Sequence, residues 1–327
     1  MNIQVESVAA LRRRSDPIVI GLVNNMPDAA LQATEQQFYG LLEAASGDRP
    51  FRLRYFTLPE LPRGEAARTR IRDRYEKLSD LWANPLDGLI VTGTEPRADD
   101  LSQEPYWASI GRLIEWTADH TISTIWSCLA AHAAVLYLDG IGRRRLAQKL
   151  SGVFLCERRG ENRLSTAGGS AWSVPHSRYN DLPLPALEAS GYCVLSGSAE
   201  VGADVFIKDR GSLDVFFQGH FEYQPDTLFR EYRRDVARYL SGERDNYPEM
   251  PRGYFDSAAA EAFEDFRRRS LHDRTASLMT NFPTPDKALR LRCPWRRPAV
   301  RIYSNWLGYL TERKSCTFER TLDEATE

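Results

Sequence analysis

Two short segments carry the residue types of a thiol-based nucleophilic site. Cys128 follows the apolar run Ile122–Ser127 and precedes a run of small residues, so we expect it at a strand-to-helix turn. Such a turn exposes a thiol and aims helix N–H groups at it, which favours the thiolate and stabilises a developing oxyanion. His220 and Glu222 follow a second apolar run, and on extended backbone side chains two apart point to the same side. The pattern predicts a Cys–His–Glu triad. The alternative is an inert buried cysteine and a histidine that has an acidic neighbour by chance.

The elements that position these residues alternate between strands and helices up to about residue 128. Apolar runs at 17–23, 51–58, 86–91 and 122–127 predict strands, and helical patterns follow Asp28, an expected N-cap, and cover Ala66–Ala83 and Tyr106–His120. This order predicts an α/β fold with a doubly wound, mostly parallel, flavodoxin-like sheet.

Shorter runs after residue 150 predict hairpin-like strands at 152–157, 192–197, 204–208 and 213–218. Helices are expected at 226–240 and 258–270, and an apolar segment at 302–310 is expected to dock on the core. The chain is therefore expected to comprise an N-terminal arm (1–16), one domain (17–247) and an irregular C-terminal extension (248–327) that packs back on the domain.

Composition excludes several classes of protein. The 327 residues hold 43 Lys and Arg against 45 Asp and Glu, a balance that demands neither nucleic acid nor a membrane surface. Apolar runs fall short of the roughly 20 residues of a membrane span, and the N-terminus lacks the apolar core of a signal peptide. The five cysteines form neither a disulfide framework nor a CxxC metal site, so we expect a reduced, cytoplasmic protein without a metal.

Nine short stretches, in order along the chain, resemble a known family. They are Asn25–Pro27 with Thr34–Gln36, Asp87–Gly93, Tyr106-Trp107, Glu115-Trp116, Lys149–Val153, Pro175–Tyr179, Gly219–Tyr223, Arg234–Val236 and Ser304–Leu307. The chain resembles the homoserine O-succinyltransferase (homoserine O-acyltransferase) family of methionine biosynthesis, which has a class I glutamine amidotransferase-like fold.

The resemblance implies a ping-pong reaction with acyl-CoA as co-substrate and no bound cofactor. Cys128 would take the acyl group from succinyl-CoA or acetyl-CoA and pass it to the hydroxyl of homoserine, with His220 as base and acid and Glu222 as its orienter. Arg234 matches the family's arginine for the amino acid's carboxylate. Lys149 and Ser177 lie in motifs that the family places at its active site, although each has an ordinary alternative as a solvated charge or a turn residue. The resemblance also implies a homodimer acting on small molecules.

The sequence departs from the family pattern at four positions. Asp28 stands where the family has Lys, Leu129 where it has Trp, and Phe221 where it has Pro. Arg97 stands where Gly accompanies succinyl-CoA and Glu accompanies acetyl-CoA; its charge suits the free carboxylate of a succinyl group and favours that donor weakly.

These departures leave other functions open. The acceptor could be serine or another metabolite, and the donor could be acetyl-CoA. An amidase is disfavoured because no glycine brackets Cys128, and a non-catalytic homologue is disfavoured because all three triad residue types are present.

The C-terminal segment 251–314 carries an excess of positive charge, with 13 Lys and Arg against 7 Asp and Glu. Its arginines at 267–269 and 290–301 are candidates for the phosphates of CoA, against a solvated surface or a subunit contact as alternatives. Nucleic-acid binding is less favoured, because no reading motif is present.

Overall fold

One nine-stranded sheet organises the molecule, in the order β2-β1-β3-β4-β9-β8-β7-β5-β6. The structure is a computed structural model that describes residues 16–166, 169–284 and 293–324, with side chains up to residue 316. The expected N-terminal arm therefore lies outside the described residues except for Asp16. Among the described residues no helix is long and apolar enough to cross a membrane.

The first half of the sheet is parallel, as the alternating pattern predicts. Its strands are β1 (Ile18–Val23), β2 (Phe51–Phe56), β3 (Leu86–Val91), β4 (Thr121–Ser127) and β9 (Leu213–Phe217). Short β-branched and aromatic runs suit strands that are buried on both faces. Because β4 and β9 are neighbours and parallel, the segments that follow them emerge at the same edge of the sheet.

The second half of the sheet is antiparallel. It contains β5 (Arg144–Arg158), β6 (Ala171–Asp181), β7 (Cys193–Ser198) and β8 (Gly202–Asp209), and β8 pairs with β9 to join the halves. The β5–β6 pairing changes register between Arg145 and Leu150, which inserts extra residues into β5. The sheet therefore adds an antiparallel half to the predicted parallel half.

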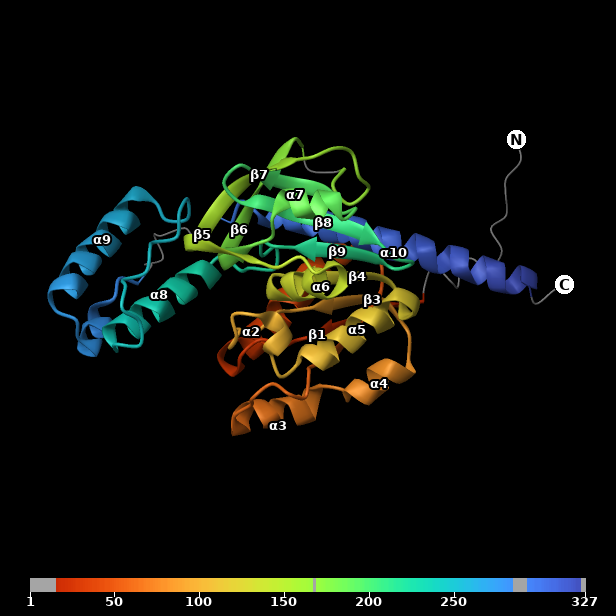
Figure 1. Cartoon of the computed structure of the whole chain (residues 1–327), viewed down its shortest axis with the longest axis horizontal. Helices are drawn as coiled ribbons and strands as arrows, with labels where there is room; N and C mark the ends of the chain where they lie inside the picture. The colour runs from red at the N-terminus through yellow and green to blue at the C-terminus, as the bar shows by residue number, and fades with distance from the viewer. Residues whose placement is uncertain (1–15, 167–168, 285–292, 325–327) are drawn as a thin grey trace.

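Helices cover both faces of the sheet (Figure 1). One face packs against α4 (Leu78–Ala83), α5 (Trp107–His120) and α6 (Leu129–Asp139), and the other against α2 (Asp28–Ser46) and α10 (Arg296–Glu324). The remaining helical segments are α3 (Glu65–Arg74), η1 (Leu101–Gln103), α7 (Leu184–Ala189), α8 (Thr227–Leu240), α9 (Ser257–His272) and η2 (Ala276–Asn281). Apolar side chains are packed on both faces of the sheet and fix the positions of its strand ends, where the candidate site lies.

The C-terminal segment is more regular than its composition predicts. The 29-residue helix α10 crosses the sheet, where the Trp306 indole N–H donates to Ser123 Oγ at 2.9 Å. A Cβ on Gly88 would lie 2.8 Å from the Trp306 ring, so the strand can approach the helix only because this residue is glycine. In Figure 1, α8 and α9 form a lobe beside the sheet, and their aromatic side chains pack together. The boundaries proposed for the domain and its extension stay predictions.

Two local expectations were wrong. The single helix expected over 66–83 is split into α3 and α4, because the N–H of Glu76 donates to Tyr55 O of β2 (2.8 Å) and pulls the backbone out of the helix. Asp28 does not cap α2; Pro27 occupies the N-cap position. The Asp28 carboxylate accepts from the N–H of Gly64 at 2.7 Å and pairs with Arg63 at 3.3 Å, so tertiary contacts use the group that would have capped the helix.

Candidate active site

Cys128 occupies a strained turn between β4 and α6. Its φ of 52° is the only positive φ of a non-glycine residue in the described part of the chain, and its ψ is −113°. Backbone in such sparsely populated regions costs on the order of 1–3 kcal/mol and concentrates at functional sites. The Cys128 N–H donates to Phe217 O of β9 at 2.7 Å, so the turn is tied to the strand that leads to His220.

The side chains of Cys128, His220 and Glu222 meet. His220 Nδ1 lies 2.7 Å from Glu222 Oε1, which leaves Nε2 for the thiol of Cys128, and the imidazole and thiol are in hydrogen-bond contact. The contact arises from a turn at His220–Glu222 rather than from the extended backbone that the sequence indicated. The backbone N–H of His220 also donates to Pro175 O of β6 at 2.8 Å, which anchors the turn.

The charge on His220 is set by its two partners. Burial alone would lower its pKa, but the negative charges of Glu222 and Cys128 outweigh burial and raise the pKa of His220 well above its ordinary value. The imidazole is therefore favoured in its protonated form, between Glu222 and Cys128. This arrangement places a basic imidazole between a thiol and an orienting carboxylate, as nucleophilic thiol catalysis requires.

Two hydrogen bonds and a ring contact connect Ser177 to His220. Ser177 Oγ donates to Glu231 Oε2, and the Tyr223 hydroxyl donates to Glu231 Oε1 at 2.6 Å. The Tyr223 ring stacks on the ring of His220, with centroids 4.2 Å apart. Burial and the nearby Glu231 raise the pKa of Tyr223 well above its ordinary value, so the hydroxyl stays protonated and donates a hydrogen bond to Glu231. Glu231 is thus separated from the His220 imidazole only by the Tyr223 side chain.

Lys149 and Arg234, which are distant in sequence, meet on one carboxylate. Lys149 Nζ lies 2.8 Å from Asp235 Oδ2, and Arg234 Nη2 lies 3.0 Å from Asp235 Oδ1. Sequence reasoning did not single out Asp235 or Glu231. The available signal for Glu231 was its position three residues before Arg234, which places both on one side of α8.

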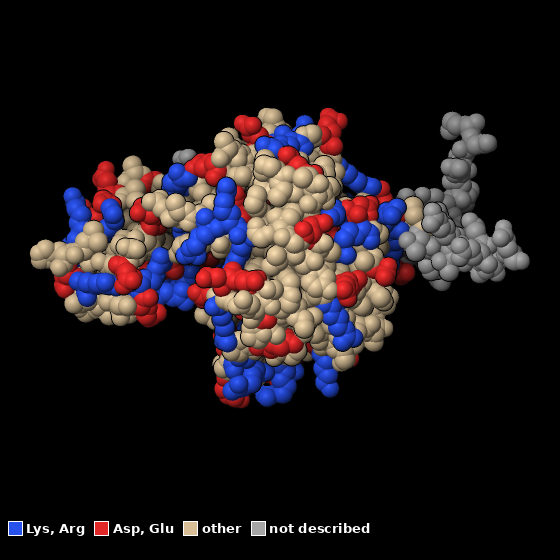
Figure 2. Space-filling model, in the orientation of Figure 1, with Lys and Arg blue, Asp and Glu red and all other residues tan. Residues whose placement is uncertain are grey.

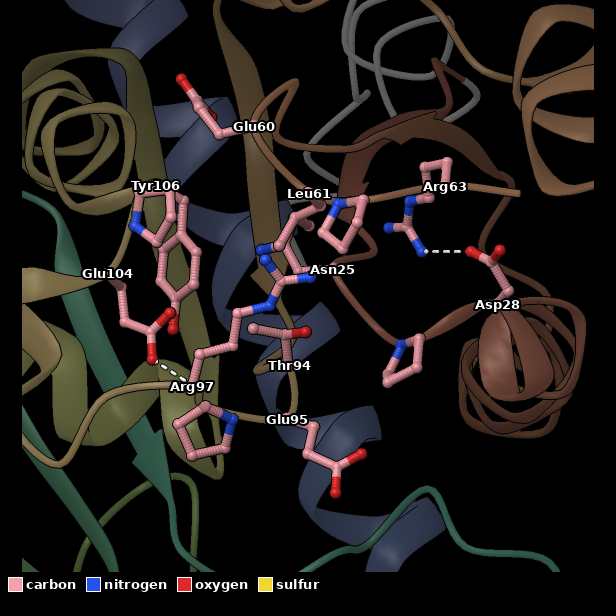
Figure 3. Close-up of a pocket in the computed structure, with 14 residues that line it drawn as sticks. Asn25, Asp28, Glu60, Leu61, Arg63, Thr94, Glu95, Arg97, Glu104 and Tyr106 are labelled. Atoms are coloured by element: carbon pink, nitrogen blue, oxygen red, sulfur yellow. Dashed lines mark hydrogen bonds and ion pairs between the residues drawn. The ribbon is translucent and has the colours of Figure 1, made fainter. Parts of the chain in front are cut away.

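Arg97 lines a pocket of about 460 Å³ at the carboxyl ends of β1 and β3. In Figure 3 its side chain extends into the middle of the pocket toward Asn25 and Tyr106. The backbone N–H groups of Arg97 and Ala98 donate to Glu104 Oε1 at 2.6 and 2.8 Å, which shapes the loop that carries the guanidinium. Within the described residues the Arg97 guanidinium has no polar partner, so it is available to an anionic ligand.

The pocket approaches Cys128 through the loop after β3. A Cβ on Gly93 would lie 2.5 Å from Leu129 Cβ, so only glycine lets this loop contact the first residue of α6. A small adjoining cavity is lined by Thr94, Leu129 and Ala130 among others. The N–H of Leu129 belongs to the first turn of α6 and has no carbonyl partner within the helix, so it can stabilise an oxyanion formed at Cys128.

One buried cluster has the residue types of a metal site, with an arginine beside it. Cys156, His176 and Asp204 bring their ligand atoms within 4.8 Å of one another. Arg178 Nε donates to His176 Nδ1 at 3.3 Å, so a neutral ring carries its proton on Nε2, which faces Asp204 at 3.4 Å. Burial lowers the pKa of His176, which keeps the ring neutral. Nε2 faces Asp204 without a hydrogen bond, but the Arg178 guanidinium on Nδ1 places a positive charge against the ring, which disfavours a metal ion there.

Comparison with known proteins decides the family. The family model described as homoserine O-succinyltransferase matches residues 2–316. The chain belongs to this family. Proteins named homoserine O-succinyltransferase from Rhodopseudomonas palustris and Bradyrhizobium japonicum are similar to it. They are 50% and 44% identical, over 81% and 92% of this chain and 80% and 93% of their own. A protein of the same name from Methylorubrum extorquens is 42% identical over 90% of this chain and 87% of its own.

The fold also matches the expectation. A glutamine amidotransferase from Thermotoga maritima superposes with a TM-score of 0.52 at 12% identity, over 91% of this chain and 99% of its own. One from Methylobacillus flagellatus superposes with a TM-score of 0.50 at 16% identity, over 90% and 94%. The resemblance to the homoserine O-succinyltransferase family is therefore confirmed, as are the class I glutamine amidotransferase-like fold and an enzyme of the acyltransferase class.

Proposed function

We propose that this member of the homoserine O-succinyltransferase family transfers a succinyl group from succinyl-CoA to the hydroxyl of L-homoserine, through a thioester on Cys128. One observation carries the mechanism: the His220 imidazole contacts the Cys128 thiol on one side and Glu222 on the other. The family membership and the names of its relatives support the substrates.

The first half-reaction begins from the imidazolium–thiolate pair. The Cys128 sulfur attacks the thioester carbonyl, and the oxyanion is stabilised by the Leu129 N–H at the start of α6. When the tetrahedral intermediate collapses, the bond to the CoA sulfur breaks and His220 gives its proton to that sulfur. CoA leaves as a thiol, Cys128 carries the succinyl group, and His220 is neutral.

The second half-reaction reverses the roles. Acylation removes the negative charge of Cys128, which is one cause of the raised pKa of His220, so the neutral imidazole can now act as a base. It takes the proton of the acceptor hydroxyl as the oxygen attacks the Cys128 thioester. Collapse releases the ester and regenerates the imidazolium–thiolate pair.

We assign the acceptor to the α8 side of Cys128. A free amino acid carries a carboxylate and an ammonium, and Arg234 and Glu231 offer the opposite charges one helical turn apart. Arg234 uses Nε and Nη2 on Asp235 and keeps its remaining nitrogen for the ligand. Ser177 holds Glu231 in place and Lys149 holds Asp235 in place, each through a hydrogen bond.

We assign the acyl chain to the pocket that contains Arg97. Its free guanidinium would pair with the distal carboxylate of a succinyl group, which acetyl lacks. The proposal includes a reducing, cytoplasmic setting, since the nucleophile works only as a thiolate. It also includes the homodimer that the family resemblance implies.

The test is the intact mass of the protein after mixing with succinyl-CoA or acetyl-CoA, first without and then with homoserine. A succinyl increment on Cys128 that disappears with homoserine is the expected result. An increment that persists would exclude homoserine and direct the search to serine and other acceptors. An increment with acetyl-CoA alone would overturn the donor assignment, and none with either donor would contradict the acyl-enzyme.

A further inference from the structure

The chemistry of His220 decides which side of Cys128 the CoA moiety occupies; this inference rests on the proposed function. His220 protonates the departing CoA sulfur and later deprotonates the acceptor hydroxyl, so both atoms occupy the same place beside its Nε2. The acyl chain stays on Cys128 and lies in the pocket with Arg97. The arm of CoA must therefore run over the surface that later holds the acceptor, beginning at Ser177 and Glu231.

Further along that surface, cations gather around Tyr179. Ser177 and Tyr179 are two residues apart on β6, so their side chains lie on the same face of the sheet. The Arg145 guanidinium and Lys149 Nζ lie 5.3 and 5.8 Å from the centre of the Tyr179 ring, and Arg244 Nη2 donates to the Tyr179 hydroxyl at 2.9 Å. We call Arg145, Lys149 and Arg244 the Tyr179 basic cluster.

The cluster lies at a distance from the triad that suits the far end of a long co-substrate. Pro175, whose carbonyl accepts from the N–H of His220, is four strand residues from Tyr179. At about 3.3 Å per residue, this corresponds to about 13 Å along β6. The pantetheine arm separates the thioester from the phosphates of CoA, so the phosphates belong at this distance from Cys128 rather than beside it.

The charges of the cluster are not balanced. Lys149 and Arg244 of the cluster contact Asp235 at 2.8 and 3.4 Å, and the neighbouring Arg234 contacts the same carboxylate at 3.0 Å, so these cations share one carboxylate. Burial would raise the pKa of Asp235, but Lys149 and Arg234 outweigh it and lower the pKa, so this carboxyl is already ionised. Arg145 has no carboxylate partner in the described part of the chain. The site therefore retains an excess of positive charge that a polyanion would neutralise.

The change of register in the sheet creates this surface. The extra residues between Arg145 and Leu150 form the irregular part of β5, which places Arg145 and Lys149 together on Tyr179. Figure 2 shows Lys and Arg side chains gathering where β5 and β6 lie beside α8. By contrast, Arg267 and Arg268 of α9 pair with Glu264 and Asp265 on their own helix, so their charges are largely neutralised.

We propose that the Tyr179 basic cluster binds the phosphate groups of the acyl-CoA donor. CoA and the acceptor then use overlapping surfaces in turn, which a ping-pong reaction permits because CoA leaves before the acceptor binds. On this proposal the arginines at 267–269 do not bind the phosphates, and Arg290 and Arg292 lie outside the described residues.

The experiment compares two succinyl thioesters, succinyl-CoA and succinyl-N-acetylcysteamine, of which the second lacks all phosphates. The readout is the ratio of their kcat/KM values for acylation of Cys128, followed by intact mass. In Arg145→Gln/Arg244→Gln the ratio should fall about tenfold or more, as expected for lost hydrogen bonds to a charged group. Arg145→Lys/Arg244→Lys, which keeps both charges, should recover most of the ratio.

Arg268→Gln is the matched control, because it removes an exposed arginine from α9, and its ratio should equal that of the wild type. An unchanged ratio in the double glutamine variant, an equal loss with both thioesters, or a fall in Arg268→Gln instead would overturn the proposal. Because Arg145 is exposed, its single variant tests the same ratio if the double variant does not fold. A wild-type protein that forms no acyl-enzyme with either thioester would remove the proposed function itself, which is a distinguishable result.

Discussion

The two sides of Cys128 are built differently. On the side of β6 and α8, polar groups are paired before any ligand binds: Ser177 and Tyr223 on Glu231, and Lys149 and Arg234 on Asp235. On the side of the pocket, Arg97 is exposed on a loop and its guanidinium has no polar partner among the described residues. Paired groups on regular elements are preorganised, whereas a free side chain on a loop is easily altered. We infer that the first side sets the reaction and the second sets the choice of acyl group.

The largest effect should come from the nucleophile between the two sides. Cys128→Ser replaces a thiolate by a neutral hydroxyl that His220 cannot ionise to the same extent, so we expect turnover to fall by about 10⁴-fold or more. Steady-state release of CoA measures this, with circular dichroism to confirm the fold. Cys193→Ser, at an exposed cysteine of β7, should retain full activity. Substantial turnover by Cys128→Ser would exclude Cys128 as the nucleophile.

Removing the charge of Glu222 should come next. Glu222→Gln keeps a hydrogen-bond acceptor for His220 Nδ1 but removes an anion that raises its pKa, so kcat should fall by about 10²–10⁴-fold. The pH profile of kcat/KM for the acyl donor should also change, with its basic limb moving to lower pH. A profile that does not move would contradict the role of Glu222 in setting the charge of His220.

The same pair predicts a pH dependence of stability. Because the folded pKa of His220 is raised above its unfolded value of about 6.5, the stabilisation is fully present below that pH and is lost as pH rises through the folded pKa. The free energy of unfolding of wild type minus that of Glu222→Gln should therefore be largest on the acidic side of this window. Chemical denaturation at several pH values measures it.

A smaller effect should separate the acceptor side from the acyl side. Arg234→Ala should raise the KM for homoserine by about tenfold, because half-exposed charge pairs contribute modestly, while the rate of Cys128 acylation changes little. The matched control is Arg233→Ala, an exposed neighbour on α8. An acceptor KM that stays at the wild-type value would place the amino acid elsewhere.

The smallest effect should be on the choice of donor. Arg97→Ala should reduce the ratio of kcat/KM for succinyl-CoA to that for acetyl-CoA by several-fold, up to about tenfold, since the guanidinium is exposed to solvent. Arg68→Ala, on the exposed face of α3, provides a control. An unchanged ratio would break the comparison between the two sides, because Arg97 would then have no part in selecting the acyl group.

Local sequence patterns predicted the structure correctly where a short apolar run can form only a buried strand. Buried parallel strands need continuous apolar residues, so the runs before Cys128 and His220 indicated β4 and the strand β9 beside it. The contact between His220 and Glu222 was anticipated with the wrong backbone, because a turn and an extended segment can both bring residues two apart together. The type of residue mattered more here than the exact path of the chain.

The same patterns failed where long-range contacts compete with local ones. Asp28 has the side chain of a helix cap, but Gly64 and Arg63 take its carboxylate. Charged segments of α10 did not predict a helix of 29 residues, since its stability comes from packing of residues such as Trp306 and Leu310 against the sheet.

The sequence by itself determined the alternation of elements, the family motifs and the residue types of the triad, because these depend on nearest neighbours in the chain. Only the tertiary structure decided that Asp235 collects cations from β5, α8 and the loop beyond it, and that Glu231 joins Ser177 to Tyr223. Such pairings join residues as much as 86 positions apart, for Lys149 and Asp235. Their energies depend on burial and distance, which no local pattern encodes.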